Sequence, residues 1–155
     1  MATGLDIIVV DDDPQVCEVL ARMIAKFHPS GQVHAFSDFL EARTFCFNRG
    51  SSVAIFVLDA YLGERTAFDL IEALGVHYPM AAADTVIVTG RASQEMVRRC
   101  LDLGVSHLLE KPVRQYALQL AIQSIAAKYL RFAPQLLSDS SFARQVGELT
   151  RGRDQ

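Results

Sequence analysis

The feature that most limits the fold of this chain is a regular alternation of short apolar runs with longer segments of helical periodicity. The apolar runs are rich in β-branched residues and almost continuous, which is typical of strands buried on both faces of a parallel sheet. The predicted strands are Leu5–Val10, Gln32–Phe36, Val53–Leu58, Thr85–Thr89 and His107–Leu109, and the predicted helices are Gln15–Phe27, Phe39–Phe47, Ala67–His77, Gln94–Leu103 and Val113–Leu130. Parallel strands joined by helical crossovers predict an α/β fold with helices on both faces of a five-stranded sheet.

Length, charge and cysteine spacing narrow the class of protein. A chain of 155 residues with 50% hydrophobic residues fits one ordinary domain with a short appendage. The net charge of -3 disfavours direct binding to nucleic acid, and no apolar run has the length of a membrane span. Cys17, Cys46 and Cys100 are too widely scattered for a disulfide framework or a zinc site. We therefore expect a cytoplasmic protein with no signal segment and no membrane contact.

Three consecutive aspartates, Asp11, Asp12 and Asp13, follow the first predicted strand and precede Pro14. Asp13 has a structural explanation, because it can cap the following helix with Pro14 at the first helical position. Capping does not explain Asp11 or Asp12. Adjacent carboxylates repel one another unless a cation or a proton relieves them. The pair is therefore a candidate cation site.

Polar residues also close three other predicted strands: Asp59, Thr89 and Lys111. The carboxyl ends of neighbouring parallel strands share one edge of a sheet, so these side chains are expected to converge with Asp11 and Asp12. Clustered carboxylate oxygens suit Mg²⁺, and a carboxylate beside a metal-held phosphoryl group can accept it. Asp59 is then the predicted nucleophile, Lys111 the counter-charge, and Thr89 a hydrogen-bond donor to the phosphate.

Taken together, these strand ends resemble those of the receiver domain of response regulators in two-component signalling. The motifs are Val10-Asp11-Asp12-Asp13-Pro14, Leu58-Asp59, Val88-Thr89-Gly90 and Glu110-Lys111-Pro112. The resemblance implies a doubly wound, flavodoxin-like sheet with the strand order 2-1-3-4-5 of the chemotaxis member of the family. It covers residues 1–131, and residues 132–155 are expected to form a tail.

The resemblance also implies a function. Asp59 would accept a phosphoryl group from a histidine kinase or a histidine phosphotransfer protein in a Mg²⁺-dependent phosphorelay. Asp12 and Asp59 would bind Mg²⁺ with the main-chain carbonyl of Tyr61, and Asp11 would contribute mostly through water. The Lys111–Pro112 peptide would be cis. Such a chain is a signalling phosphoprotein, not an enzyme with a separate substrate, although it can catalyse its own phosphorylation and dephosphorylation.

Signalling in this family would pass through the face made by the fourth helix, fifth strand and fifth helix. Leu108 occupies the position where receivers usually carry Tyr or Phe, which puts the usual switch on that face in question. Gly63 and Ala67 are smaller departures in the loop after Asp59. Tyr116 and Leu120 add apolar surface to the last helix, so a homodimer or a downstream protein partner is expected there.

The tail and two alternative functions stay open at this stage. Phe142, Val146 and Leu149 recur at helical spacing, so residues 132–155 are expected to hold one short helix or the start of a linker.

Asp11 and Asp13 also fit a haloacid-dehalogenase-like phosphatase, but that family requires an acidic pair on a later strand and leaves Asp59 without a role. A receiver-shaped interaction module that is not phosphorylated is the other alternative, which Leu108 keeps open.

Overall fold

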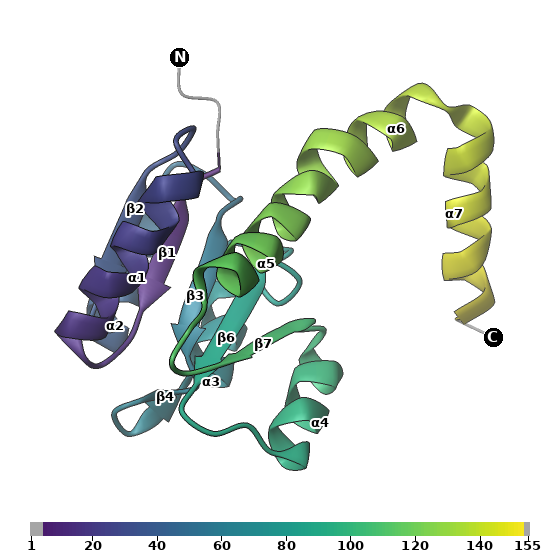
Figure 1. Ribbon diagram of the computed structural model, residues 1–155. Helices are drawn as coiled ribbons and strands as arrows, with labels where there is room; N and C mark the ends of the chain where they lie inside the picture. The colour runs from purple at the N-terminus through teal and green to yellow at the C-terminus, as the bar shows by residue number, and fades with distance from the viewer. Residues whose placement is uncertain (1–4, 154–155) are drawn as a thin grey trace. The chain divides into compact units, whose positions relative to one another are not determined.

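The computed structural model describes residues 5–153 of the chain. The chain divides into two compact units, Met1–Ile122 and Gln123–Gln155. The first unit contains the sheet and the candidate site, and the second unit is helical (Figure 1). The predicted boundary at residue 131 stays a prediction.

The first unit is built on the predicted five-stranded parallel sheet. Its strands are β1 (Ile7–Val10), β2 (Val33–Phe36), β3 (Ile55–Asp59), β6 (Thr85–Thr89) and β7 (His107–Glu110), in the spatial order β2-β1-β3-β6-β7. All four neighbouring pairs are parallel. Counted along the sheet-forming strands alone, this is the order 2-1-3-4-5, which is confirmed.

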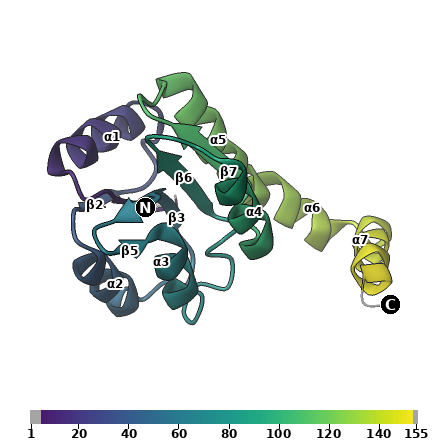
Figure 2. The ribbon, with the colours of Figure 1, turned by 90° about the horizontal axis from the view of Figure 1, so that it is seen from below.

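Helices cover both faces of this sheet, as predicted. They are α1 (Pro14–Phe27), α2 (Phe39–Asn48), α3 (Ala67–Leu74), α4 (Gln94–Leu103) and α5 (Gln115–Ala127). Figure 2 shows α1 and the beginning of α5 on one side of the sheet, with α2 and α3 on the other. Because both faces are covered, every residue of β1, β3 and β6 is buried, which explains why these strands are continuous apolar runs.

Local sequence signals set several boundaries of these helices. The Asp13 carboxylate accepts a hydrogen bond from the Gln15 N–H at 2.9 Å, with Pro14 in the first turn, so the predicted cap is confirmed. Ser93 caps α4, and Gly104 ends it in the left-handed conformation with φ 91°. Thr85–Thr89 and Gln94–Leu103 match their predicted ranges residue for residue.

Other boundaries differ from prediction by one to three residues, and one pair of strands is new. Helix α3 ends at Leu74 and not at His77, because Gly75 follows and its N–H closes the last turn on the Ile71 carbonyl. Residues 61–66 form a short antiparallel hairpin, β4 (Tyr61–Leu62) and β5 (Arg65–Thr66), which the sequence pattern does not predict. Gly63 takes a positive φ of 67° in its turn, a conformation that favours glycine.

The second unit is a helical segment. The end of α5 continues into a π-helical turn, η1 (Lys128–Phe132), and then into α6 (Ala133–Ser138), a helix that the sequence pattern does not predict. The short helix predicted from the spacing of Phe142, Val146 and Leu149 is present as α7 (Ser140–Arg153). The rings of Phe132 and Phe142 meet edge to face, with centroids 5.8 Å apart. None of the helices described in either unit is long and apolar enough to cross a membrane.

A polar network stabilises the edge of the sheet where the strands begin. The buried Tyr78 hydroxyl donates a hydrogen bond to the Cys46 carbonyl at 2.7 Å and accepts one from the Arg49 guanidinium at 3.2 Å. The same guanidinium pairs with the Asp6 carboxylate at 3.0 Å. Helix α2, the loop after it and the segment before β1 are therefore tied to one buried phenol.

We predict that Tyr78→Phe lowers the free energy of unfolding by about 1–3 kcal/mol. The Cys46 carbonyl loses the hydrogen bond that the Tyr78 hydroxyl donates, and the Arg49 guanidinium loses the same hydroxyl as an acceptor. Equilibrium urea denaturation measures the change. Tyr116→Phe is the matched control, since Tyr116 is 74% exposed, and it should stay within about 0.5 kcal/mol of the unchanged protein. Equal effects of the two substitutions would contradict the role given to the buried hydroxyl.

Candidate functional site

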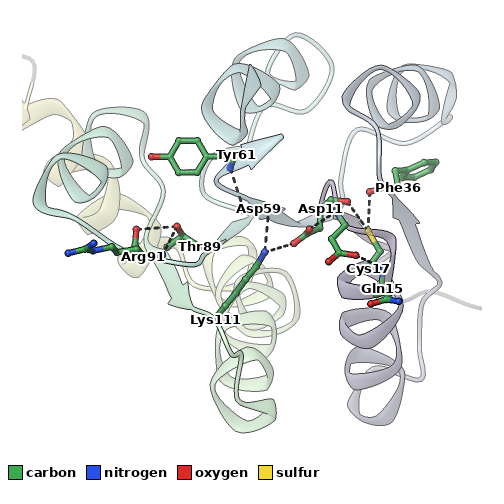
Figure 3. Close-up of polar contacts among 10 residues, drawn as sticks. Asp11, Gln15, Cys17, Phe36, Asp59, Tyr61, Thr89, Arg91 and Lys111 are labelled. Atoms are coloured by element: carbon green, nitrogen blue, oxygen red, sulfur yellow. Dashed lines mark hydrogen bonds and ion pairs between the residues drawn. The ribbon is translucent and has the colours of Figure 1, made fainter. Parts of the chain in front are cut away.

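The sheet brings the predicted site residues together at the carboxyl ends of four neighbouring strands. Asp11 follows β1, Asp59 closes β3, Thr89 closes β6 and Lys111 follows β7. Asp11, Asp59 and Lys111 meet directly, and Thr89 lies beside them on the next strand (Figure 3). The parallel register alone places these four side chains on one edge.

Three carboxylates form the acidic part of the site. One oxygen each from Asp11, Asp12 and Asp59 lies within 4.8 Å of the other two. Asp11 and Asp59 are buried, whereas Asp12 is exposed. The Asp11 carboxylate also accepts a hydrogen bond from the Asp13 N–H at 2.9 Å, which fixes its orientation. The Asp13 carboxylate caps α1 and is not part of this cluster.

Lys111 supplies the counter-charge. Its ammonium nitrogen lies 2.8 Å from an Asp11 oxygen and 3.5 Å from an Asp59 oxygen. Burial by itself would lower the pKa of Lys111, but the hydrogen bond to Asp11 and the two negative charges raise it overall, so the ammonium stays charged. One positive charge thus stands against three carboxylates.

The charge on Asp59 is unfavourable in this setting. Burial raises its pKa above the ordinary value, and the nearby Asp11 carboxylate raises it further, while Lys111 and the Tyr61 N–H act in the opposite direction. That N–H lies 3.5 Å from an Asp59 oxygen. A carboxylate with a raised pKa in a cluster of like charge is a site where a bound cation is favourable.

The donor set suits a hard divalent cation. Asp11, Asp12 and Asp59 offer carboxylate oxygens, and the Tyr61 main chain lies next to Asp59 (Figure 3). Mg²⁺ prefers oxygen ligands, takes one or two carboxylates and keeps several waters, so a partly exposed cluster of this kind fits it. The cluster contains none of the nitrogen or sulfur ligands that zinc prefers.

Thr89 is present at the edge, but its hydroxyl is engaged elsewhere. It donates a hydrogen bond to the Arg91 carbonyl and accepts one from the Arg91 N–H, both at 3.3 Å. The Thr89 carbonyl accepts a bond from the Lys111 N–H at 2.8 Å, which joins β6 to the end of β7. The Lys111–Pro112 peptide is cis, as the resemblance implies.

Leu108 lies in the middle of β7, opposite Ile87 of β6. It is half-buried and packs against the apolar core beneath α2, α3 and α4. The neighbouring His107 points to the other face, because consecutive strand residues alternate, so it does not replace the missing aromatic ring on the Leu108 face.

Two features of the site could not be anticipated from the sequence. The Glu110 carboxylate accepts a hydrogen bond from the Ala92 N–H at 3.1 Å. A groove of about 350 Å³ also opens next to Lys111, lined by Asp13, Gln15, Val16, Val19, Leu20, Met23, Lys111, Pro112 and Val113. A single glutamate and scattered apolar residues of α1 carry no motif that would have identified either feature.

Comparisons with known proteins agree with this geometry. Residues 7–123 match the family model of the response regulator receiver domain. The transcriptional regulatory protein DcuR of Escherichia coli O157:H7 is 27% identical over 109 residues, which are 70% of this chain and 44% of that protein. The two-component response regulator PprB of Pseudomonas aeruginosa is 26% identical over 108 residues, which are 69% of this chain and 38% of PprB. The chain therefore spans less than half the length of these curated relatives.

Solved structures support the fold. A response regulator receiver domain protein from Clostridium thermocellum aligns with a TM-score of 0.71 at 18% identity, over 81% of this chain and 96% of that one. A CheY-like receiver domain protein from Methanospirillum hungatei JF-1 aligns with a TM-score of 0.69 at 21% identity, again over 81% and 96%. The doubly wound, flavodoxin-like architecture is thus confirmed.

We predict that Asp59→Asn raises the free energy of unfolding of the metal-free protein, because it removes a buried charge from a crowded acidic cluster. The raised pKa means that folded Asp59 holds its proton more tightly than the unfolded chain does. The contribution of Asp59 to stability should therefore fall as pH rises from about 4 through its folded pKa, and the advantage of the Asn variant should grow over that range. Urea denaturation in a chelator at several pH values measures it.

Asp38→Asn is the control for this substitution. Asp38 caps α2 through the Glu41 N–H at 3.0 Å, away from the cluster, and Asn caps a helix as well as Asp does. It should leave stability nearly unchanged. Added Mg²⁺ should reduce the stability difference between Asp59→Asn and the unchanged protein. The unchanged protein keeps the Asp59 carboxylate and should bind the ion more tightly, and tighter binding stabilises the folded state more. A destabilised Asn variant in chelator would contradict the electrostatic account.

Proposed function

Because this chain belongs to the response regulator receiver domain family, we propose that it is a phosphoacceptor that receives a phosphoryl group on Asp59 in a two-component phosphorelay. The observation that carries the proposal is the position of Asp59. Its carboxylate is buried at the strand-end edge, within 4.8 Å of two other carboxylates and 3.5 Å from the Lys111 ammonium. No other aspartate in the described cluster combines this burial with the closing position of β3.

The acidic cluster is the proposed Mg²⁺ site. Asp12 and Asp59 would bind the ion with the Tyr61 main-chain carbonyl, and Asp11 would act mostly through water. Bound Mg²⁺ supplies charge neutralisation, without which an anionic phosphodonor would be repelled by three carboxylates. Lys111 complements it from the other side, since its ammonium already contacts both Asp11 and Asp59.

The transfer itself needs mainly positioning. An Asp59 oxygen forms a new bond to phosphorus as the bond between phosphorus and the donor histidine nitrogen breaks, and the electron pair stays with the imidazole. Lys111 then pairs with the phosphoryl oxygens. The Thr89 hydroxyl can donate to them once it leaves the Arg91 carbonyl. Gly90 is small and would leave the phosphoryl group accessible, and the space next to its α-carbon is open.

The two alternative functions gain no support. A haloacid-dehalogenase-like phosphatase would need Asp13 as a second catalytic carboxylate, but Asp13 caps α1 and faces the Gln15 N–H. An interaction module without phosphorylation would not need the Asp11, Asp59 and Lys111 contacts. None of the comparisons favours either function. We therefore infer a signalling domain that catalyses its own phosphorylation and dephosphorylation.

The proposed phosphodonor is a histidine kinase or a histidine phosphotransfer protein in the cytoplasm. The groove beside Lys111 supports a protein donor, because its α1 side presents Val16, Val19 and Met23 next to the charged edge. Val19 is 49% exposed. For the output we propose a downstream protein or a second copy of the chain, and no direct contact with nucleic acid or membrane. Tyr116 and Leu120 on α5 are 74% and 70% exposed, as such a contact requires.

We predict that the protein gains one phosphate when it is incubated with acetyl phosphate and Mg²⁺, and that Asp59→Asn abolishes the gain. Intact mass spectrometry measures it, and a chelator should prevent it. Asp13→Asn is the control, since Asp13 lies outside the cluster and should still allow full phosphorylation. A gain in the Asp59→Asn protein, or its loss in the Asp13→Asn protein, would place the acceptor elsewhere.

We also predict that Val19→Glu slows phosphotransfer from a phosphorylated histidine protein by about tenfold or more, because docking would bury a new charge in an apolar groove. Phosphorylation by acetyl phosphate should be unchanged, since a small donor needs no groove. Val97→Glu on α4 is the matched control, because Val97 is also exposed but does not line the groove. Rates of phosphoprotein formation with the two donors distinguish an effect on docking from an effect on phosphoryl transfer. Equal slowing by both Glu variants would exclude the groove as the docking surface.

A further inference from the structure

The loop that connects β6 to α4 is held by side chains at three successive points. The Thr89 hydroxyl accepts a hydrogen bond from the Arg91 N–H at 3.3 Å. The Glu110 carboxylate accepts one from the Ala92 N–H at 3.1 Å. The Ser93 hydroxyl accepts one from the Met96 N–H at 3.2 Å. Thr89 closes β6 and Ser93 caps α4, the two elements that the loop joins, whereas Glu110 belongs to β7.

Glu110 is therefore the side chain that ties this loop to the neighbouring strand. It lies directly opposite Thr89 in the β6–β7 register, and the next residue is Lys111. Consecutive residues near the end of a strand project in opposite directions. Here Lys111 contacts Asp11 and Asp59. Glu110 instead contacts the β6–α4 loop, in which Arg91 binds the Thr89 hydroxyl.

Helix capping does not account for the Glu110 contact. Ser93 already caps α4, and Ala92 precedes that cap, outside the helix. The bond instead fixes the residue next to Arg91, whose N–H and carbonyl both hold the Thr89 hydroxyl. A shift of Ala92 would move Arg91 with it, because the two residues share a peptide bond.

We propose that Glu110 is a positioning residue for Thr89. By holding Ala92 against β7, it keeps the Arg91 main chain where it binds the Thr89 hydroxyl, and so opposes the turn of that hydroxyl toward a phosphoryl group on Asp59. The proposal rests on the proposed function of Asp59. It deepens that function by identifying a residue that sets the balance between the resting loop and the phosphate-bound loop.

Loss of the hydrogen bond between the Ala92 N–H and the Glu110 carboxylate should change the affinity for a phosphate mimic. A ligand that binds one of two loop arrangements shows a weaker apparent affinity when that arrangement is sparsely populated. Removing the acceptor at Glu110 raises the population of the arrangement in which Thr89 is free to reach the phosphate. A phosphate mimic at Asp59 should then bind more tightly, although Glu110 does not touch it.

The test compares Glu110→Ala, Glu110→Gln and the unchanged protein. Glu110→Ala removes the acceptor, whereas Glu110→Gln keeps a carbonyl oxygen at the same reach. Glu95→Ala controls for the loss of a negative charge, because Glu95 is an exposed acidic residue in the first turn of α4, the helix that follows the loop. Nuclear magnetic resonance measures amide exchange at Arg91 and Ala92, and titration with beryllofluoride and Mg²⁺ gives the half-saturating concentration from the same resonances.

We expect Glu110→Ala to speed exchange at Ala92 and to lower the half-saturating beryllofluoride concentration by about threefold to tenfold, the effect of losing one exposed hydrogen bond of ordinary strength. Glu110→Gln should recover most of this difference, and Glu95→Ala should match the unchanged protein. Unchanged exchange and affinity in Glu110→Ala would overturn the proposal. Equal shifts in the Ala and Gln variants, or an equal shift in Glu95→Ala, would overturn it as well, since charge alone would then explain them.

Failure of this inference is distinguishable from failure of the proposed function. If the unchanged protein takes neither phosphate from acetyl phosphate nor beryllofluoride, Asp59 is not an acceptor, and the role of Glu110 in its response falls with it. If the unchanged protein is phosphorylated and all variants respond alike, only the role of Glu110 is overturned. The exchange measurement needs no phosphoryl group and tests the tie to Ala92 by itself.

Discussion

The contact between one ammonium group and two buried carboxylates is the interaction on which this site depends. Lys111 lies 2.8 Å from Asp11 and 3.5 Å from Asp59, and the three residues come from the ends of β7, β1 and β3. Without that cation the parallel sheet would bring negative charges together with no partner, at a cost that burial increases. The same contact places Lys111 where a phosphoryl group on Asp59 would need a counter-charge, so one residue would serve both the fold and the proposed chemistry.

The sheet and most of its helices could be predicted because their signals are local and strong. Burial on both faces leaves a continuous apolar run, and a cap such as Ser93 or Gly104 marks a helix end without reference to the rest of the chain. The β4–β5 hairpin could not be predicted, because strands of two residues carry no periodicity. The predicted end of α3 at His77 is wrong, because the apolar periodicity continues past Leu74, whereas the helix ends there and Gly75 follows.

The meeting of the candidate site residues could be predicted because each of them follows a predictable strand. Asp11, Asp59, Thr89 and Lys111 follow apolar runs, and the parallel sheet turns that position into proximity. The resting position of the Thr89 hydroxyl was not predictable, because it depends on the course of a loop and not on a motif. Glu110 belongs to the same class, since an exposed glutamate has no sequence signature and acquires meaning only through the Ala92 N–H that it faces.

Leu108 limits the ways in which the site can signal. It is half-buried against the core under α2, α3 and α4, and an aliphatic side chain has no hydroxyl whose hydrogen bond could change partner. Beside Lys111, this edge offers the Thr89 hydroxyl, the Arg91 main chain and the Glu110 carboxylate as groups that can exchange hydrogen bonds, and these three lie on or against the loop before α4. A rearrangement that starts at Asp59 would therefore have a path to the surface through that loop and the beginning of α4.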